Sequence, residues 1–292
     1  MISVFIDGSE GTTGLNLRQR LTFSDVEILD IDENLRKEPD ERKRLINAAD
    51  CVFLCLPDEA ARQAAALCEN PRTVIIDAST AHRVAPGWAY GFPELSPAHA
   101  LAVAASRRIA VPGCHASGFC ALIYPLRAKG LLPREAELSC VSLTGYSGGG
   151  KAMIEQYEGG GRANACASYY ALTLRHKHLP EMQAVCSLAV PPVFTPAVLP
   201  VRQGMLVTVP LHADADTLYA ALAGHYAACE GITVYRDTGG AMPDIQAANG
   251  TDRLDIFVFG HGAQTLLAAR FDNLGKGACG AAIQCFGMRY GL

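Results

Sequence analysis

Short apolar runs alternate with polar, amphipathic segments through residues 1–80. Apolar runs that continue without polar interruption, such as CVFLCL, are typical of strands buried on both faces of a parallel sheet. The pattern predicts strands at 2–8, 25–32, 51–57 and 73–79, a helix carrying Leu15, Leu17 and Leu21, and helices at 39–50 and 58–70. Because strands and helices alternate, we expect an α/β fold with a Rossmann-type doubly wound parallel sheet.

The pattern changes near residue 112, which indicates a second domain of α+β type with an antiparallel or mixed sheet. Its predicted helices lie at about 116–129, 151–158 and 216–229, and its predicted strands at 184–213 (with proline breaks), 232–237 and 253–260. The tail is rich in glycine and then helical. We therefore predict a cofactor domain of residues 1–113 with the C-terminal helix 275–292, and a catalytic and oligomerisation domain of residues 114–274.

Composition narrows the class of protein. The chain has 292 residues, of which 50% are hydrophobic and 18% charged, with a formal net charge of −4. No basic patch or long apolar run is present, so we expect neither a nucleic-acid partner nor a membrane. The N-terminus lacks the pattern of a signal peptide.

The eleven cysteines lie mostly in apolar stretches and include no C-x-x-C pair. They indicate a reduced, cytoplasmic setting, with no disulfide framework and no metal site.

Three glycines form G-x-x-G-x-x-G between the first strand and the first helix: Gly8, Gly11 and Gly14. This context is that of a dinucleotide-binding turn, although the spacing differs from G-x-G-x-x-G by one residue and an ordinary strand-to-helix turn is the alternative. Asp30 and Asp32 at the end of the second strand are candidates to bind the ribose of NAD. Arg36 and Lys37 are candidates for the 2′-phosphate of NADP, so the residues alone leave the choice open.

The stretch VPGCHASG places Cys114 after a Pro-Gly turn and at the start of a helix. The partial positive charge of a helix N-terminus favours a thiolate, which makes Cys114 a candidate nucleophile. Most cysteines are packing residues, and Cys120 inside the same helix is expected to be one. Lowering a thiol pKa from about 8.5 to about 6.5 raises the thiolate fraction only about tenfold near neutral pH, so catalysis requires a base and oxyanion donors as well.

The stretch LRHKHLPEM carries two histidines two residues apart, His176 and His178. If this stretch is extended, both side chains point the same way. They are then candidates for a catalytic base or for metal ligands, with a solvated polar loop as the alternative. No third ligand lies nearby in sequence. His115 follows the cysteine directly, and we expect it to point away from Cys114.

Seven stretches in this order resemble the shorter form of the N-acetyl-γ-glutamyl-phosphate reductase family. They are FIDGSEGTTGL, FLCLPDEAARQA, IIDASTAHRV, GWAYGFPEL, VPGCHASGF, HKHLPEM and DNLGKGACGAAIQ. A wider resemblance links the chain to aspartate-semialdehyde dehydrogenase, which shares the cysteine and the two-domain plan. The resemblance implies that NADPH reduces N-acetyl-γ-glutamyl phosphate to the semialdehyde with release of phosphate, through a cysteine thioester, in arginine biosynthesis.

The resemblance also implies a role for individual residues. Cys114 would be the nucleophile and His178 the general acid/base, with His176 as the alternative. Arg83, His176 and Glu181 would bind substrate. The cofactor would be NADP(H), held by Gly8, Gly11, Thr12, Thr13, Gly14, Arg36, Ser79, Asn273 and Gly275.

The GGG runs on either side of Lys151–Glu158 are candidates for a flap that excludes water from a thioester, or for an ordinary flexible loop. A homo-oligomer is expected from the family alone. Two rival functions stay open at this point: an enzyme like aspartate-semialdehyde dehydrogenase, and a non-catalytic NADP-binding sensor.

Overall fold

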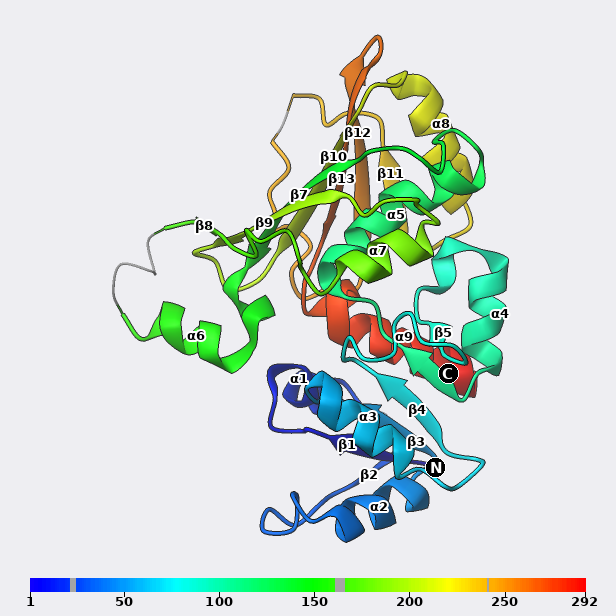
Figure 1. The fold of residues 1–292 in the computed structure, drawn as a ribbon, viewed down its shortest axis with the longest axis vertical. Helices are drawn as coiled ribbons and strands as arrows, with labels where there is room; N and C mark the ends of the chain where they lie inside the picture. Colours follow the sequence, from blue (N-terminus) through cyan, green and yellow to red (C-terminus); the bar gives the residue numbers. More distant parts are fainter. Residues whose placement is uncertain (22–24, 161–165, 241) are drawn as a thin grey trace. The chain divides into compact units, whose positions relative to one another are not determined.

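The computed structural model describes residues 1–21, 25–160, 166–240 and 242–292. The chain divides into two compact units, one of Met1–Gly113 with Ala281–Leu292 and one of Cys114–Gly280. The sequence placed the return of the chain to the first unit at residue 275, whereas residues 275–280 belong to the second unit in the structure. Figure 1 shows the two sheets that form the centres of these units.

A six-stranded, wholly parallel sheet forms the first unit, in the order β2-β1-β3-β4-β6-β5. The strands are β1 (Ile2–Asp7), β2 (Val26–Leu29), β3 (Cys51–Leu54), β4 (Val74–Asp77), β5 (Ala89–Tyr90) and β6 (Arg108–Ala110). The helices are α1 (Thr12–Arg20), α2 (Pro39–Ala48), α3 (Asp58–Ala66), the 3-10 turn η1 (Pro93–Leu95), α4 (Pro97–Ala105) and α9 (Gly280–Tyr290). Every residue of β3 and β4 is buried, as the continuous apolar runs predicted. The predicted Rossmann-type sheet is confirmed.

The strand order reverses at β1, because β2 lies on one side of it and β3 on the other. In open α/β sheets, ligands bind at such a switch point, beyond the carboxyl ends of the strands. The helix that follows β1 is α1, which buries Leu17. Leu21 directly after it is buried too, whereas Leu15 is 44% exposed. Leu15 and Leu17 lie on different faces of the helix, because two residues along a helix turn by about 200°.

A seven-stranded mixed sheet forms the second unit, in the order β11-β12-β13-β10-β7-β9-β8. The strands are β7 (Ser139–Gly145), β8 (Ser168–Tyr169), β9 (Val193–Leu199), β10 (Met205–Leu211), β11 (Ile232–Tyr235), β12 (Leu254–His261) and β13 (Gln264–Phe271). The helices are α5 (Cys114–Ala128), the 3-10 turn η2 (Tyr146–Gly149), α6 (Gly150–Glu158), α7 (Leu179–Val185), α8 (Ala215–Tyr226) and the π-helical turn η4 (Gly275–Cys279). The predicted α+β domain with a mixed sheet is confirmed.

The predicted start of the long strands at residue 184 is wrong. Residues 184 and 185 end α7, a turn follows in which Ser187 has a φ of 52°, and β9 begins only at Val193. Pro180 lies in the first turn of α7, where a proline is well tolerated because no helical N–H is needed there. A short apolar run such as AVCSLAV does not distinguish the end of a helix from a strand.

Helix α5 packs closely against β10 and β13 (Figure 1). The contact passes through Gly118, where a Cβ atom would lie 2.5 Å from Cγ2 of Val207 and 2.9 Å from Cε1 of Phe271. Only a residue without a side chain permits this approach of the helix to the sheet. No helix in the described part of the chain is long and apolar enough to span a membrane.

We expect Gly118→Ala to destabilise the protein by about 1–3 kcal/mol, because the added methyl group overpacks the interface between helix and sheet. Gly224→Ala in α8 is the matched control, since a Cβ there meets nothing within 4 Å. The control is expected to gain about 0.5–1 kcal/mol from the better helix propensity of alanine. Urea unfolding of both variants measures the difference, and equal stability of Gly118→Ala and wild type would contradict the packing argument.

Candidate active site

The glycine turn joins the carboxyl end of β1 to α1 and is unusually tight. Gly8 has a φ of +92°, and a Cβ there would lie 2.4 Å from the backbone oxygen of Cys55. A Cβ at Gly14 would lie 2.4 Å from the oxygen of Gly8. Gly11 donates its N–H to Gly8 O at 3.1 Å and is the N-cap of α1. The first helical residues are Thr12 and Thr13. Backbone N–H groups at such a helix start are suited to bind a pyrophosphate.

A cavity of about 490 Å³ opens beside this turn. It is lined by Ile6, Asp7, Gly8, Ser9, Glu10, Ile31, Glu33, Arg36, Lys37, Arg42, Leu56 and Ala60. The lining thus combines the glycine turn with the segment after β2, where a dinucleotide places its adenosine ribose. The space and the cradle fit a nicotinamide dinucleotide.

Asp30 and Asp32, the two candidates to bind a ribose, do not line this cavity. Asp30 forms a bidentate ion pair with Arg18. Asp32 accepts the N–H of Asn34 at 2.8 Å, which closes a local turn. Arg36 and Lys37 do line the cavity, together with Glu33. The carboxylates that would favour a ribose hydroxyl are thus engaged elsewhere, and two cations are left to favour a phosphate.

Arg42 is a cavity residue that the sequence did not reveal. Its Nε and Nη2 donate to Oδ2 of Asp7 at 3.1 and 2.7 Å. Burial raises the pKa of Asp7, and the hydrogen bond and charge of Arg42 oppose that rise. Arg42 therefore holds a buried carboxylate at the floor of the cavity. The only signal for it was its place on the buried side of a predicted amphipathic helix.

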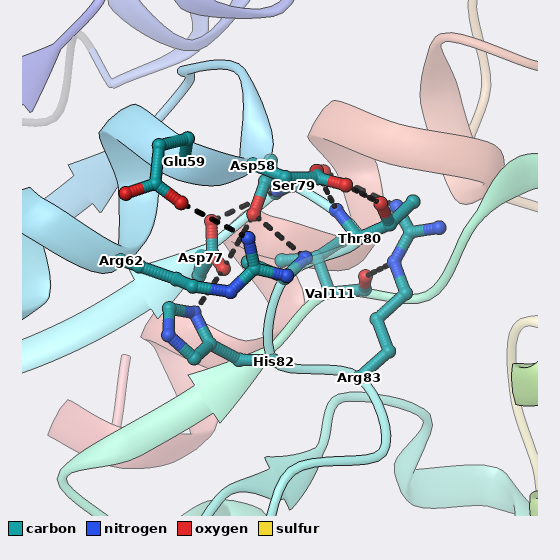
Figure 2. Close-up of polar contacts among 11 residues, drawn as sticks. Asp58, Glu59, Arg62, Asp77, Ser79, Thr80, His82, Arg83 and Val111 are labelled. Atoms are coloured by element: carbon teal, nitrogen blue, oxygen red, sulfur yellow. Dashed lines mark hydrogen bonds and ion pairs between the residues drawn. The ribbon is translucent and has the colours of Figure 1, made fainter. Parts of the chain in front are cut away.

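The loop after β4 is built around the fully buried carboxylate of Asp77. Asp77 accepts the N–H of Ser79 at 2.9 Å, the hydroxyl of Ser79 at 2.7 Å, and contacts Nδ1 of His82 at 2.6 Å (Figure 2). The ring of His82 stacks on Trp88 with centroids 3.9 Å apart. The Ser79 hydroxyl also accepts the N–H of Ala81 at 3.1 Å, so its hydrogen bonds stabilise the conformation of this loop.

The same loop fixes Arg83. Its Nε donates to Val111 O at 2.9 Å, as Figure 2 shows, and its Nη2 donates to Ala78 O at 3.2 Å. The loop is also tied to the first residue of α3, because the carboxylate of Asp58 accepts both the N–H and the hydroxyl of Thr80. Two backbone carbonyls thus set the plane of the guanidinium, and Val111 lies three residues before Cys114 along the chain.

Cys114 is the first residue of α5, a helix of 15 residues, and its side chain is partly exposed. The predicted position at a helix N-terminus is confirmed, and Cys120 is fully buried, as expected. The charge of a Cys114 thiolate contributes to raising the pKa of Tyr170, after burial of the phenol, so the two groups are near each other. A partly exposed thiol at a helix N-terminus has the setting of a reactive cysteine.

His176 and His178 lie together, but not on an extended segment. Residues 177–178 form a turn, and His178 has helical backbone angles as the N-cap of α7. The ring centroids are 4.8 Å apart, and the N–H of His178 donates to Nδ1 of His176 at 3.2 Å. His178 is buried and His176 half-buried. The two rings thus lie together as expected, but a turn brings them together and not an extended segment.

His115 completes this group, which the sequence did not predict. Its ring is buried, with centroids 5.4 Å from His176 and 5.5 Å from His178. Nδ1 lies 2.7 Å from Oγ of Ser142, and Nε2 lies 2.6 Å from the hydroxyl of Tyr170. Burial above all, with the nearby charges of His176 and Lys177, lowers the pKa of His115 to about 3. His115 is therefore neutral at physiological pH.

The remaining predicted residues lie as follows. Glu181 is 2% exposed, in the first turn of α7. Asn273 uses its amide inside the second unit, accepting the N–H of Gly204 at 2.9 Å and donating to Oγ of Ser147 at 2.9 Å. Gly275 opens η4, where a Cβ would lie 2.2 Å from Thr251 O. In the part of the chain that the structure describes, no three His, Cys, Asp or Glu side chains are grouped to hold a metal.

The proposed flap contains α6, and contacts bind its two ends together. Tyr146 stacks on Tyr157 with centroids 4.9 Å apart, and its hydroxyl donates to Glu158 at 3.1 Å. Arg202 forms an ion pair with Glu158. The second GGG run ends at Gly161, which lies outside the described residues.

Comparison with known proteins agrees with this geometry. Residues 3–103 match the model of the semialdehyde dehydrogenase NAD binding domain, and residues 114–273 match that of the semialdehyde dehydrogenase dimerisation domain. An aspartate semialdehyde dehydrogenase from Francisella tularensis has the same fold, with a TM-score of 0.74 at 13% identity, covering 99% of each chain.

Two relatives are similar in sequence over nearly the whole length. The N-acetyl-gamma-glutamyl-phosphate reductase of Chelativorans sp. (strain BNC1) is 46% identical, covering 96% of this chain and 96% of its own. That of Burkholderia ambifaria is 43% identical, covering 99% of this chain and 96% of its own. At 43–46% identity over nearly the full length of both chains, the chain belongs to the N-acetyl-gamma-glutamyl-phosphate reductase family.

Proposed function

We propose that this protein reduces N-acetyl-γ-glutamyl phosphate to N-acetylglutamate semialdehyde with NADPH, releasing phosphate, as a step of arginine biosynthesis. Identity of 43–46% to reductases of that name over nearly the full length is the observation that carries the proposal. The aspartate-semialdehyde dehydrogenases share only the fold, at 13–17% identity. A sensor that only binds NADP has no need of a nucleophilic cysteine in the unit that also holds the histidine cluster.

Cys114 is the proposed nucleophile. Its thiolate attacks the acyl carbon of the substrate, the bond from that carbon to the phosphate oxygen breaks, and a thioester forms with inorganic phosphate as the leaving group. The N-terminus of α5 stabilises the thiolate. The thioester is the form of the acid that a hydride donor can reduce.

The histidine pair supplies the proton. His178 is the proposed general acid/base, which protonates the oxygen of the hemithioacetal formed by hydride addition and takes that proton back when the Cys114 thiolate leaves and the aldehyde forms. His178 is the N-cap residue of α7 and is buried beside His176. His176 and Glu181 are the proposed substrate contacts beside it. Arg83, whose plane is set by Val111 and Ala78, is the proposed partner of the acyl phosphate.

The cofactor site is the cavity beside the glycine turn. Gly8, Gly11 and Gly14 with Thr12 and Thr13 would hold the pyrophosphate, and Arg36 with Lys37 the 2′-phosphate of NADP(H). When bound, NADPH supplies the hydride. Ser79, Asn273 and Gly275 stay proposed cofactor contacts, although the side chains of Ser79 and Asn273 already bond within their own units.

The partners are a small-molecule substrate and a second copy of the chain. A homo-oligomer is supported by the match of the second unit to a dimerisation domain and by exposed apolar side chains on its sheet, Val193, Tyr235 and Leu266. We place the enzyme in the cytoplasm, because none of the eleven cysteines, all within the described residues, forms a disulfide.

One assay tests the proposed function directly. In the reverse direction, phosphate-dependent reduction of NADP⁺ is followed at 340 nm with N-acetylglutamate semialdehyde and, separately, with aspartate semialdehyde. Turnover with the first and little with the second supports the proposal. The opposite preference would make the chain an aspartate-semialdehyde dehydrogenase, and no turnover with either would make it a sensor.

Cys114→Ser is expected to abolish turnover while NADPH still binds. A serine hydroxyl is hardly ionised at neutral pH, so acyl transfer fails, whereas the glycine turn is untouched. Turnover and NADPH fluorescence titration measure the two properties. Retention of more than a few per cent of the activity would remove Cys114 from the role of nucleophile.

Arg36→Ala is expected to raise the KM for NADPH more than that for NADH, since only NADPH carries the phosphate that Arg36 would bind. Arg44→Ala is the matched control, because Arg44 pairs with Glu41 on the same helix and neither residue lines the cavity. Steady-state kinetics with both cofactors give the ratio. If Arg36→Ala changes both values of KM equally, the phosphate has another partner.

His178→Asn is expected to lower kcat by at least about a hundredfold, the usual contribution of a positioned acid/base. His176→Asn is expected mainly to raise the KM of the substrate. The limb of the pH–rate profile that reports the acid/base should disappear only in the His178 variant. A larger loss of kcat in His176→Asn than in His178→Asn would exchange the two roles.

A further inference from the structure

A buried hydrogen-bonded chain runs from the sheet of the second unit to the surroundings of Cys114. Ser142 of β7 is fully buried, and its Oγ lies 2.7 Å from Nδ1 of His115. The other ring nitrogen of His115 lies 2.6 Å from the hydroxyl of Tyr170. Both distances are those of short, well-formed hydrogen bonds. None of the roles proposed above uses this chain of three groups.

The chemistry of the three groups determines which group donates and which accepts in each of the two hydrogen bonds. A neutral imidazole has one donor nitrogen and one acceptor nitrogen. Within the described residues, the Ser142 hydroxyl contacts only Nδ1, so its buried proton is satisfied only by donating there. Nε2 then carries the proton and donates to the oxygen of Tyr170. The phenolic proton of Tyr170 remains available to an acceptor other than His115.

The surroundings keep both rings neutral and in place. His115 is 3% exposed and packs against the rings of His176, His178 and Phe194. The backbone N–H of Tyr170 donates to Pro196 O at 3.1 Å, which ties the tyrosine to β9. Burial and then the charge of Cys114 raise the pKa of Tyr170, so the phenol stays a donor.

We infer that Tyr170, oriented by the Ser142–His115 pair, donates a hydrogen bond to the acyl oxygen while Cys114 is acylated. Tyr170 is then a catalytic residue, and His115 and Ser142 are positioning residues that act through it. A fixed neutral donor is suited to this task, because negative charge develops on that oxygen when the thiolate attacks the carbonyl carbon. This inference rests on the proposed role of Cys114 as the nucleophile.

The test uses acyl transfer from p-nitrophenyl acetate to Cys114, which needs neither cofactor nor natural substrate. The thiolate forms a bond to the acetyl carbon, the ester bond breaks, and p-nitrophenolate is released and measured at 400 nm. Alkylation of Cys114 by iodoacetamide is measured in parallel, because that reaction needs a thiolate but develops no charge on an acyl oxygen. Cys114→Ser gives the background of both reactions.

Tyr170→Phe removes only the hydroxyl and is expected to slow p-nitrophenolate release about 10- to 100-fold, with alkylation within about twofold of wild type. Tyr169→Phe is the matched control, since the neighbouring ring is 61% exposed, and it should change neither rate. His115→Gln should slow release to a similar extent. The double variant Tyr170→Phe/His115→Gln should be no slower than Tyr170→Phe, because the two residues act as one unit.

Release at the wild-type rate in Tyr170→Phe would overturn the inference. So would an equal loss of release and alkylation, which would place the effect on the thiolate or on the fold. Failure of the proposed function is a separate result. In that case the wild type would not reduce NADP⁺ with N-acetylglutamate semialdehyde and phosphate, while the effect of Tyr170→Phe on p-nitrophenolate release would persist.

Discussion

The close packing of α5 on its sheet at Gly118 is the contact on which the chemistry of the second unit depends. Because Gly118 has no side chain, the side chains of Val207 and Phe271 pack directly against the backbone of α5 and hold its N-terminal turn close to β10 and β13. That turn carries Cys114 and His115. The same approach brings His115 within hydrogen-bond distance of Ser142 on β7. One glycine thus positions both the candidate nucleophile and the ring beside it.

A nucleophile that works as an anion is destabilised by any second anion beside it. Burial keeps two groups beside Cys114 uncharged. His115 stays neutral because its cation would lose its hydration, and Tyr170 stays protonated because its phenolate would lose its hydration.

Burial of His115 makes the folded protein less stable in acid. The folded-state pKa of His115 is about 3, below that of an unfolded histidine, so between about pH 6.5 and pH 3 the unfolded chain binds more protons and stability falls as pH falls.

The sequence predicted most of what periodicity and glycine geometry determine. The buried strands, the glycine turn and the position of Cys114 at a helix start follow from local patterns, and the structure contains each of them. The sequence could not predict contacts between residues far apart in the chain. His115 and Ser142 are 27 residues apart, and His115 and Tyr170 are 55 apart. A histidine beside a cysteine therefore gave no sign of the hydrogen bonds it makes.

The choice of cofactor also depends on a contact between residues far apart in the chain, which the sequence could not predict. The sequence placed three carboxylates (Asp30, Asp32 and Glu33) and two cations (Arg36 and Lys37) within eight residues after β2, and charge alone could not rank them. The structure ranks them by pairing. Asp30 is neutralised by Arg18, a residue twelve positions earlier on α1, and Asp32 is used by its own turn. What a pocket recognises is therefore decided by which charges the rest of the fold leaves available, and Arg36 and Lys37 remain in its wall beside Glu33.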